Sequence, residues 1–180
     1  MADDVRRRTA AGAVGTASSE RWEAIGRKQF RFLKRHGLER RHRMLEIGCG
    51  NLRAGRHFIR YLRPGRYTGV DISPEILLAA QQTLVNDELQ PKQPRLYLVA
   101  GIDLDFLADA AYDVIHAHSV FTHTPLEVIE GYLAAAHRLL RPGGFFDFTY
   151  HHTDDAPWDF LQEDYYYPTD FLLRRAAAIG

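Results

Sequence analysis

Short apolar runs alternate with segments of helical periodicity along most of this 180-residue chain. Five of the runs have the length and the β-branched or aromatic content of buried strands, at residues 44–47, 67–71, 95–99, 113–119 and 145–150. Between them, apolar residues recur at spacings of three and four, as on one face of a helix. Strands that alternate with helices predict an α/β protein with a mainly parallel sheet.

Local signals mark where two of these helices begin. Ser73 followed by Pro74 predicts a helix start, because serine caps free amides and proline suits the first helical position. Residues 124–127, Thr-Pro-Leu-Glu, have the spacing of a capping box for the last helix before residue 145. The Arg-Pro-Gly-Gly sequence at 141–144 is expected to end that helix.

The first apolar run leads into two glycines, Gly48 and Gly50, that are separated by one residue. A glycine turn after a strand lets a small molecule lie against bare backbone, because no Cβ blocks it. Twenty-one residues after Gly50, Asp71 ends the second run, where a carboxylate can accept hydrogen bonds from both hydroxyls of a ribose. The pair predicts a nucleoside cofactor.

The residues around the turn indicate which nucleoside. A dinucleotide site usually has a third glycine three residues after the second, and this chain has Arg53 there. Glu46 places a negative charge near the strand end, which disfavours phosphates and suits a ligand with an ammonium and a sulfonium group. These features favour S-adenosylmethionine over a nicotinamide dinucleotide.

At this point the residues resemble the class I S-adenosylmethionine-dependent methyltransferases. Residues 46–50, Glu-Ile-Gly-Cys-Gly, are similar to the glycine motif of that family, and Asp71 is similar to its ribose-binding acid. The run from 113 to 150 resembles the strand, helix, Leu-Arg-Pro-Gly-Gly and strand that follow the adenine site in these enzymes. The departure is Leu52, where many members have a third glycine, so the loop near the methionine moiety is expected to differ in shape.

The resemblance implies a Rossmann-like, three-layer αβα sandwich and a set of cofactor-binding residues. Near the adenine ring it implies an acid and the next backbone amide, for which we select Asp103 and Leu104, with Asp105 and Phe106 one register away. The alternative is that these acids only lie in a solvated loop. The expected cofactor-binding residues are Glu46, Gly48, Cys49, Gly50, Asp71, Ile72, Asp103, Leu104, His118 and Ser119.

His118 and Ser119 follow the fourth strand, and ligands of open parallel sheets collect at such carboxyl ends. If the acceptor is a hydroxyl, a general base helps, and histidine is best matched to neutral pH. We select His123 from the candidates His118, His123, His151 and His152; the competing interpretation is that His123 binds a neighbouring backbone group. Adjacent histidines on a strand point to opposite faces, so residues 151–155 are not expected to hold a metal.

The C-terminal end departs from the expected order. Members of the family normally continue with two more strands, and none is evident after residue 150, so we expect a truncated sheet that lacks its last two strands. The uncovered edge beside Phe146 and Phe148 would then favour self-association. Residues 1–17 are expected to form a flexible basic tail, and residues 18–180 one domain that begins with a helix from Ser18 or Ser19.

The composition of the chain bears on the size of its core, on the role of its cysteine and on its location. The chain is 46% hydrophobic and has zero net charge, which allows one full core. Cys49 is the only cysteine, so no intramolecular disulfide can form, and it is expected to fill space rather than act as a nucleophile. No apolar run approaches a membrane span, and the N-terminus lacks a secretory signal, so a soluble cytoplasmic protein is expected.

The sequence therefore favours an S-adenosylmethionine-dependent methyltransferase acting on a small-molecule acceptor. Two alternatives remain, a non-catalytic binding module that keeps the fold, and an NAD(P)-dependent Rossmann oxidoreductase. The excess of Lys and Arg before residue 44 could contact nucleic acid, but a solvated helix face explains it as well and no recognition motif supports a nucleic-acid substrate.

Overall fold

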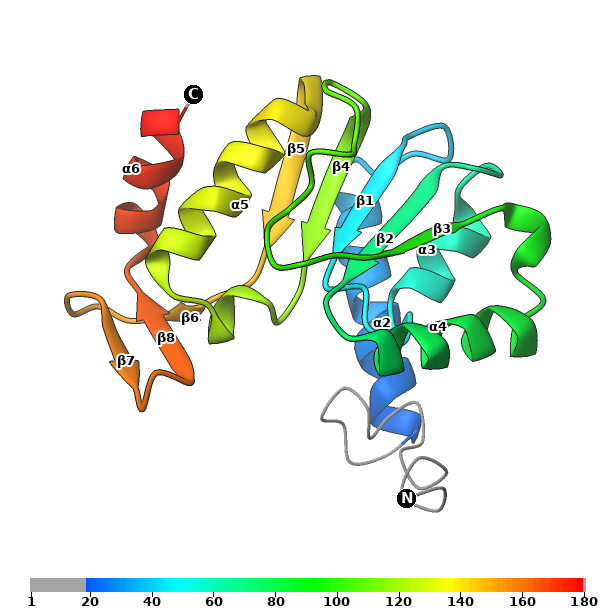
Figure 1. Ribbon diagram of the computed structural model, residues 1–180, viewed down its shortest axis with the longest axis horizontal. Coiled ribbons are helices and arrows are strands. Elements are labelled where there is room, and N and C mark those ends of the chain that lie inside the picture. The colour runs from blue at the N-terminus through cyan, green and yellow to red at the C-terminus, as the bar shows by residue number, and fades with distance from the viewer. Residues whose placement is uncertain (1–18, 180) are drawn as a thin grey trace. The chain divides into compact units, whose positions relative to one another are not determined.

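Parallel strands that alternate with helices form the framework of each part of the chain in the computed structural model, which describes residues 19–179 (Figure 1). The chain divides into two units, one that ends at Leu98 and one that begins at Val99. Parallel strands that alternate with helices confirm the predicted α/β, Rossmann-like class. The tail predicted at residues 1–17 lies outside the described residues, and the prediction of one domain stays a prediction.

The first unit contains three parallel strands in the order β3, β2, β1. They are β1 (Met44–Ile47), β2 (Tyr67–Asp71) and β3 (Arg95–Leu98). Every residue of β1 and β2 is buried, as expected for strands covered on both faces. Ile47 pairs with Val70, so the turn after β1 and the acid that ends β2 lie at the same edge of the sheet.

Three helices and a short 3-10 turn complete the first unit. They are α2 (Ser19–Arg35), α3 (Gly55–Tyr61), α4 (Pro74–Asn86) and η2 (Gln90–Lys92). The predicted start of α4 is confirmed, because the Ser73 side chain accepts a hydrogen bond from the Ile76 amide at 3.2 Å and Pro74 occupies the first turn. The core side chains include Leu33, Phe58, Ile59 and Leu62, which are almost completely buried.

The second unit begins with two parallel strands joined by a helix that runs beside the second of them (Figure 1). These elements are β4 (Tyr112–Ala117), η3 (Phe121–His123), α5 (Leu126–Leu139) and β5 (Leu140–Phe148). The predicted capping box is wrong: Pro125 is the N-cap, and the Thr124 hydroxyl donates to the Val120 carbonyl at 2.7 Å instead. The glycines that were expected to separate helix from strand lie inside β5, where the register shifts.

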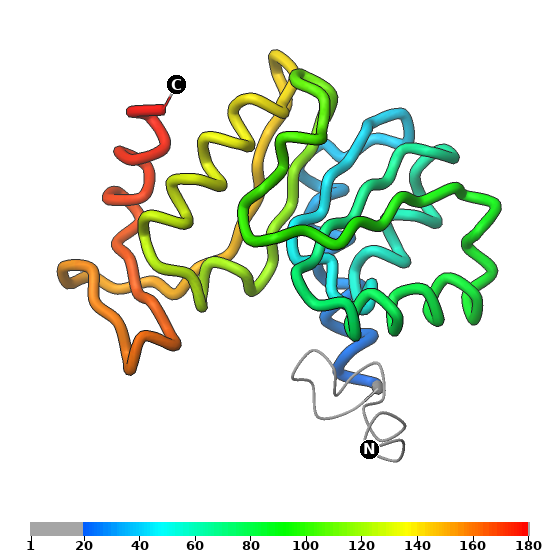
Figure 2. Tube along the Cα trace, in the orientation of Figure 1, coloured from blue at the N-terminus to red at the C-terminus, as the bar shows by residue number. Residues whose placement is uncertain are grey.

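The expectation of a truncated sheet is wrong, because further strands follow β5. They are β6 (His151–His152), β7 (Trp158–Phe160) and β8 (Asp164–Tyr167), after which α6 (Thr169–Ile179) follows. They form a small mixed sheet of their own, with β8 parallel to β6 and antiparallel to β7. Figure 2 shows this segment in orange to red along the Cα trace. Self-association through the edge of β5 stays a prediction.

The sequence concealed these strands for two physical reasons. Each has only two to four residues, which is too short for alternation to be visible. The turn between β7 and β8 has Leu161 and Gln162 at φ values of 55° and 57°. Such a left-handed hairpin turn is normally signalled by Asn or Gly, and neither is present.

The turn after β1 contains a comparable exception, which yields a testable prediction. Leu52 has a φ of 65° although its side chain is completely buried. A left-handed backbone costs a residue with a Cβ about 1 kcal/mol and costs glycine almost nothing. Both Leu52→Ala and Leu52→Gly remove the buried side chain, at about 2–5 kcal/mol. We expect the Gly variant to be at least as stable as the Ala variant in urea denaturation.

The matched control is the same pair of changes at Leu78, a residue of α4 with 72% of its surface exposed. There the Ala variant should be the more stable one by about 1 kcal/mol, because glycine loses more backbone entropy than alanine when it is fixed in a helix. The same order at both positions would contradict the proposed backbone strain at Leu52.

Candidate functional site

The turn after β1 is anchored to the end of β2 by backbone amides. Gly48 and Gly50 have φ values of 65° and 55°, a conformation that glycine adopts without a steric penalty. The Cys49 amide donates to the Val70 carbonyl at 3.0 Å, and the Gly50 amide donates to the Asp71 carboxylate at 2.8 Å. The two residues that the sequence placed together, Gly50 and Asp71, are therefore in direct contact.

Asp71 also organises the segment that follows it. Its second carboxylate oxygen accepts a hydrogen bond from the Ser73 amide at 3.0 Å, and Ser73 in turn caps α4. Between them, Ile72 has an apolar side chain that is 65% exposed. Asp71 therefore binds both the glycine turn and the residue that caps α4. Its contact with Ser73 was not predicted from the sequence.

Glu46 has a partner within the first unit. Its carboxylate is 5% exposed and accepts a hydrogen bond from the hydroxyl of Tyr67, which lies on the neighbouring strand. Burial and the nearby negative charge of Glu46 raise the pKa of Tyr67, so the phenol stays protonated and donates. A Cβ on Gly55 would come within 2.5 Å of the Tyr67 oxygen and 3.0 Å of Glu46, so glycine at the start of α3 leaves room for this pair.

Cys49 lies inside the turn and is almost completely buried. Burial raises the pKa of its thiol well above the ordinary value, and the negative charges of Glu46 and Asp71 raise it further. Since the thiolate is the nucleophilic form, these surroundings make Cys49 unreactive. The geometry supports the interpretation that it fills space.

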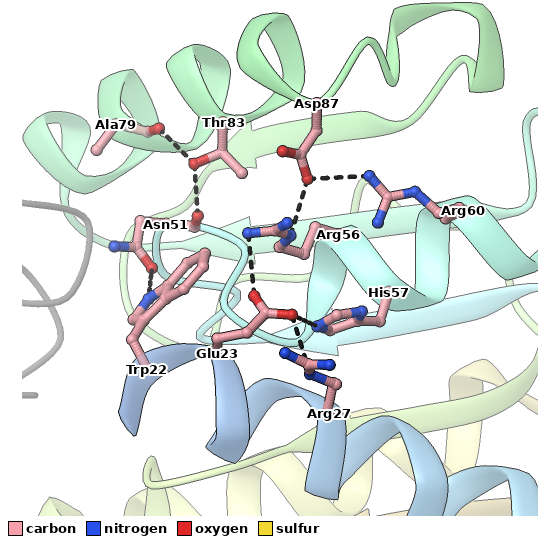
Figure 3. Close-up of polar contacts among 10 residues, drawn as sticks. All are labelled: Trp22, Glu23, Arg27, Asn51, Arg56, His57, Arg60, Ala79, Thr83 and Asp87. Carbon is pink, nitrogen blue, oxygen red and sulfur yellow. Dashed lines mark hydrogen bonds and ion pairs between the residues drawn. The ribbon is translucent and has the colours of Figure 1, made fainter. Parts of the chain in front are cut away.

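A polar network surrounds the turn and joins it to two helices, α2 and α4 (Figure 3). The Trp22 indole of α2 donates to the Asn51 side chain at 3.1 Å, and the Thr83 hydroxyl of α4 donates to the Asn51 carbonyl at 3.0 Å. Asn51 itself is fully buried. Asn51, the residue after Gly50, is therefore held from two sides. These contacts were not predicted from the sequence.

Charged residues that lie between α2, α3 and α4 extend this network (Figure 3). Arg56 of α3 lies 3.2 Å from Glu23 of α2 and 2.8 Å from Asp87, which follows α4. The Arg56 guanidinium also lies 5.2 Å from the Trp22 ring centre. Arg56 thus links α2, α3 and α4, and no local signal in the sequence distinguished it from other basic residues.

In the second unit, Asp103 lies in an exposed loop after β3, where its carboxylate accepts the Asp105 amide at 3.3 Å. Leu104 has a buried side chain, and its carbonyl accepts from Arg138 of α5 at 3.0 Å. Arg138 also lies 3.3 Å from the Asp105 carboxylate. The loop is held by one arginine that the sequence analysis did not select.

His118 and Ser119 follow β4 as predicted. The His118 ring lies 3.0 Å from the Ser119 hydroxyl, and the Ser119 amide donates to Thr149 at 2.8 Å. Ser119 is exposed and has a φ of 60°, an unusual conformation for serine. Nearby, the strand residue His116 is buried and lies 2.7 Å from the Asp147 carboxylate, a pair that was not predicted.

His123 ends η3 and is 61% exposed at its side chain. Its Nδ1 atom lies 3.0 Å from the Glu163 carbonyl and 2.9 Å from the Asp164 carboxylate of β8. Within residues 19–179, no group of three or more His, Cys, Asp or Glu side chains is arranged to hold a metal ion. None of the helices in that range has the length and apolar character that crossing a membrane demands.

The hydrogen bonds to Asp71 lead to a stability prediction. In Asp71→Asn, the amide NH₂ group would face a backbone amide that also donates, so one hydrogen bond is lost inside the protein. We expect the free energy of unfolding to fall by about 1–3 kcal/mol in urea denaturation without any ligand. The control, Asp154→Asn, changes a fully exposed side chain and should have almost no effect. Equal effects would contradict the anchoring role of Asp71.

The burial of Cys49 leads to a second prediction. Because the pKa of its thiol is raised in the folded state, raising the pH ionises the thiol of the unfolded chain first. Labelling with dithiobis(nitrobenzoic acid) at pH 8 should be slow in the native protein and fast in urea. Rapid native labelling would show that the thiol is accessible and ionised.

The methyltransferase domain family matches residues 45–146 of this chain. Among solved structures, the chain is similar to 1,6-didemethyltoxoflavin-N1-methyltransferase from Burkholderia thailandensis, with 24% identity, a TM-score of 0.66, and coverage of 87% of this chain and 67% of that one. Phosphoethanolamine N-methyltransferase 2 from Haemonchus contortus has 18% identity, a TM-score of 0.71, and coverage of 86% and 36%.

The [4+2]-cyclase SpnF has 19% identity, a TM-score of 0.73, and coverage of 85% of this chain and 57% of its own. At these identities the structural likeness shows the fold alone. The family match extends over more than half of the sequence and includes the glycine turn and Asp71. This chain therefore belongs to the methyltransferase domain family.

Proposed function

We propose that this chain transfers a methyl group from S-adenosylmethionine to a small-molecule acceptor, with the adenosyl group bound at the glycine turn and Asp71. The observation that carries the proposal is the hydrogen bond from the Gly50 amide to the Asp71 carboxylate. It holds bare backbone and a carboxylate at one edge of the sheet, where a nucleoside can contact both.

Asp71 retains the capacity to bind a ribose. Each carboxylate oxygen accepts one backbone amide, from Gly50 or Ser73, and such an oxygen can accept about two hydrogen bonds. Each oxygen can therefore accept about one further hydrogen bond, and the two ribose hydroxyls can donate them. Beside it, the exposed side chain of Ile72 offers an apolar surface to the adenine ring.

The charge around the turn favours a cationic ligand. Burial raises the pKa of Cys49, which lies between the glycines, and the negative charges of Glu46 and Asp71 raise it further, so these two acids contribute a negative potential inside the turn. A negative potential attracts the sulfonium and ammonium groups of S-adenosylmethionine and repels the pyrophosphate of a dinucleotide. The two negative charges, together with membership of the methyltransferase domain family, disfavour the NAD(P)-dependent oxidoreductase.

The contacts of the second unit favour one of the two registers considered for the adenine site. Asp105 lies within ion-pair distance of Arg138, whereas the Asp103 carboxylate accepts only a backbone amide among the contacts in the described residues. Asp103 with the Leu104 amide therefore stays our assignment for the adenine ring. The roles of His118 and Ser119 at the methionine end also stay predictions.

Methyl transfer requires little from the protein beyond positioning. S-adenosylmethionine supplies an electrophilic methyl group and a good leaving group, and oriented reactants gain up to about 7–11 kcal/mol in favourable cases. This chain needs to bind and align the two reactants, and it needs a base only if the acceptor must lose a proton. We assign that base to His123.

Two measurements test the proposal. In isothermal titration calorimetry, S-adenosylhomocysteine should bind the wild-type protein and bind Asp71→Ala about 10- to 100-fold more weakly, through the loss of charge-assisted hydrogen bonds. Asp154→Asn should bind like the wild type. Thermal melting of each variant shows whether it is folded at the titration temperature. Binding of NAD in place of S-adenosylhomocysteine would overturn the assignment.

The remaining alternative, a module that binds the cofactor without turnover, requires an activity measurement. The fold alone does not exclude it, since the [4+2]-cyclase SpnF has a similar structure. We expect S-adenosylhomocysteine to be released from S-adenosylmethionine in the presence of a panel of small hydroxyl and amine acceptors. Cofactor binding with no release on any acceptor would favour the binding module.

A further inference from the structure

The two units of the chain carry opposite charge. Residues 19–98 contain sixteen Lys and Arg against eight Asp and Glu, whereas residues 99–179 contain four against thirteen. From the sequence, the basic excess before residue 44 was explained equally well by a solvated helix face and by a contact with nucleic acid. The structure of the first unit distinguishes the two, because it shows where unpaired basic side chains gather.

Three loops of the first unit lie at one edge of its sheet. They are residues 36–43, 62–66 and 87–94, and they precede β1, β2 and β3. Because these strands are parallel, the loops lie at their amino ends, whereas the glycine turn and Asp71 lie at the carboxyl ends (Figure 1). The three loops are therefore at the opposite edge of the sheet from the glycine turn.

Hydrogen bonds join the three loops to one another. The Arg63 amide donates to the Arg40 carbonyl, and the Gly65 amide donates to the Lys92 carbonyl, both at 2.8 Å. The Lys92 ammonium also donates to the Leu62 carbonyl at 2.7 Å. The basic residues of these loops are distant in sequence, and the fold holds their backbones in fixed positions relative to one another.

Five basic residues at these amino ends form what we call the basic edge: Arg40, Arg63, Arg66, Lys92 and Arg95. Arg40, Arg63 and Arg95 are exposed, and the other two are half-buried. Among the described residues, no carboxylate lies within ion-pair distance of any of the five. None of them lies in an α-helix, so a solvated helix face does not describe them.

The acids of the same loops offset this charge only in part. Glu39 lies 3.0 Å from Arg41, and Asp87 lies 2.8 Å from Arg56 of α3, so both are paired with arginines outside the basic edge. Glu88 is exposed and has no ion-pair partner within the described chain. Five cations are thus accompanied by one unpaired acid, which leaves a positive potential over the basic edge.

The composition of the three loops indicates the kind of partner. None of the exposed large apolar residues of the described chain lies in them. A stable protein interface has a desolvated apolar core, and exposed charge pairs at its rim contribute little. A phosphodiester backbone needs no apolar contact, because the release of its condensed counterions drives binding. Arginine suits such a partner, since its planar guanidinium can donate two hydrogen bonds to one phosphate.

We propose that the basic edge binds the phosphate backbone of a nucleic acid, whatever its base sequence. Contacts to phosphates hold a nucleic acid in place without reading its bases. The nucleic acid is a docking partner rather than the methyl acceptor, because the basic edge and the glycine turn are at opposite ends of the same strands. This inference does not depend on the proposed function.

Binding is tested by fluorescence anisotropy with labelled oligouridylate, oligothymidylate and a mixed-sequence DNA duplex, each of about 20 nucleotides per strand. We expect the wild-type protein to bind all three at low salt. For the duplex, the logarithm of the binding constant should fall against the logarithm of salt concentration with a slope of about −3 to −5, since each neutralised phosphate contributes about 0.9. The absence of binding to every probe at low salt would overturn the proposal.

The basic edge is tested with the double variant Arg63→Gln, Arg66→Gln. It should bind the duplex about tenfold more weakly or worse at low salt, and the salt slope should become shallower by about 2. Its affinity for S-adenosylhomocysteine should not change, because both residues lie away from the glycine turn. Unchanged affinity for the duplex in a variant that melts like the wild type would contradict the proposal. Nucleic-acid binding without S-adenosylhomocysteine binding would overturn the proposed function and leave this inference in place.

Lys28 and Arg31 provide the matched control. Both are exposed on α2 and have no ion-pair partner within the described residues. The double variant Lys28→Gln, Arg31→Gln removes the same charge from a helix face and should weaken duplex binding by less than about threefold, since salt screens charges that do not contact the ligand. A loss equal to that of the first double variant would show that total charge governs binding rather than the basic edge.

Two other anionic partners are tested in parallel. Sedimentation velocity at low and high salt detects pairing of the basic edge with acidic residues of a second copy. Vesicles of phosphatidylcholine with phosphatidylserine detect binding to a membrane surface. Self-association or vesicle binding that is lost in Arg63→Gln, Arg66→Gln, together with no binding of the nucleic-acid probes, would assign the basic edge to that partner and overturn the proposal.

Discussion

The hydrogen bond from the Gly50 amide to the Asp71 carboxylate is the contact on which the first unit depends. It joins the turn after β1 to the end of β2, and the same carboxylate accepts the amide of Ser73, which caps α4. A ligand that binds Asp71 therefore contacts a group whose position is already determined by the fold. Such preorganisation limits the entropy that binding must cost.

Asp71 and Glu46, the two acids near the turn, have different hydrogen-bond partners and different roles. Asp71 faces backbone amides and keeps capacity for a ligand, whereas one oxygen of Glu46 is occupied by the buried hydroxyl of Tyr67. Burial, and after it the negative charges of these two acids, raises the pKa of the Cys49 thiol and keeps it protonated. The same pair of charges adds to the effect of burial in suppressing nucleophilic chemistry at the cysteine and, under the proposed function, favours a cationic ligand at the same turn.

In the second unit, the small sheet that follows β5 supplies the partners of His123. Glu163 and Asp164 determine the ring tautomer, and Tyr167 holds the loop that carries the histidine. An exposed ion pair of this kind contributes little to stability, about 0–1 kcal/mol. Its importance lies in orientation, because it decides which nitrogen has the lone pair. The two interpretations of His123, base and backbone partner, are thus compatible: the same ring nitrogen binds the backbone and leaves the other one available.

The sequence by itself determined the α/β class, the strands that end at the glycine turn and at Asp71, and the cap formed by Ser73, because each follows from local periodicity and short-range chemistry. It did not reveal β6, β7 and β8, whose turn uses Leu161 and Gln162 in a conformation normally marked by glycine or asparagine. Nor did it identify Tyr67 as the partner of Glu46 or Asp164 as the partner of His123, which are 21 and 41 residues away in sequence. Such pairs form only where folding brings distant strands together, and that placement was decided by the tertiary structure alone.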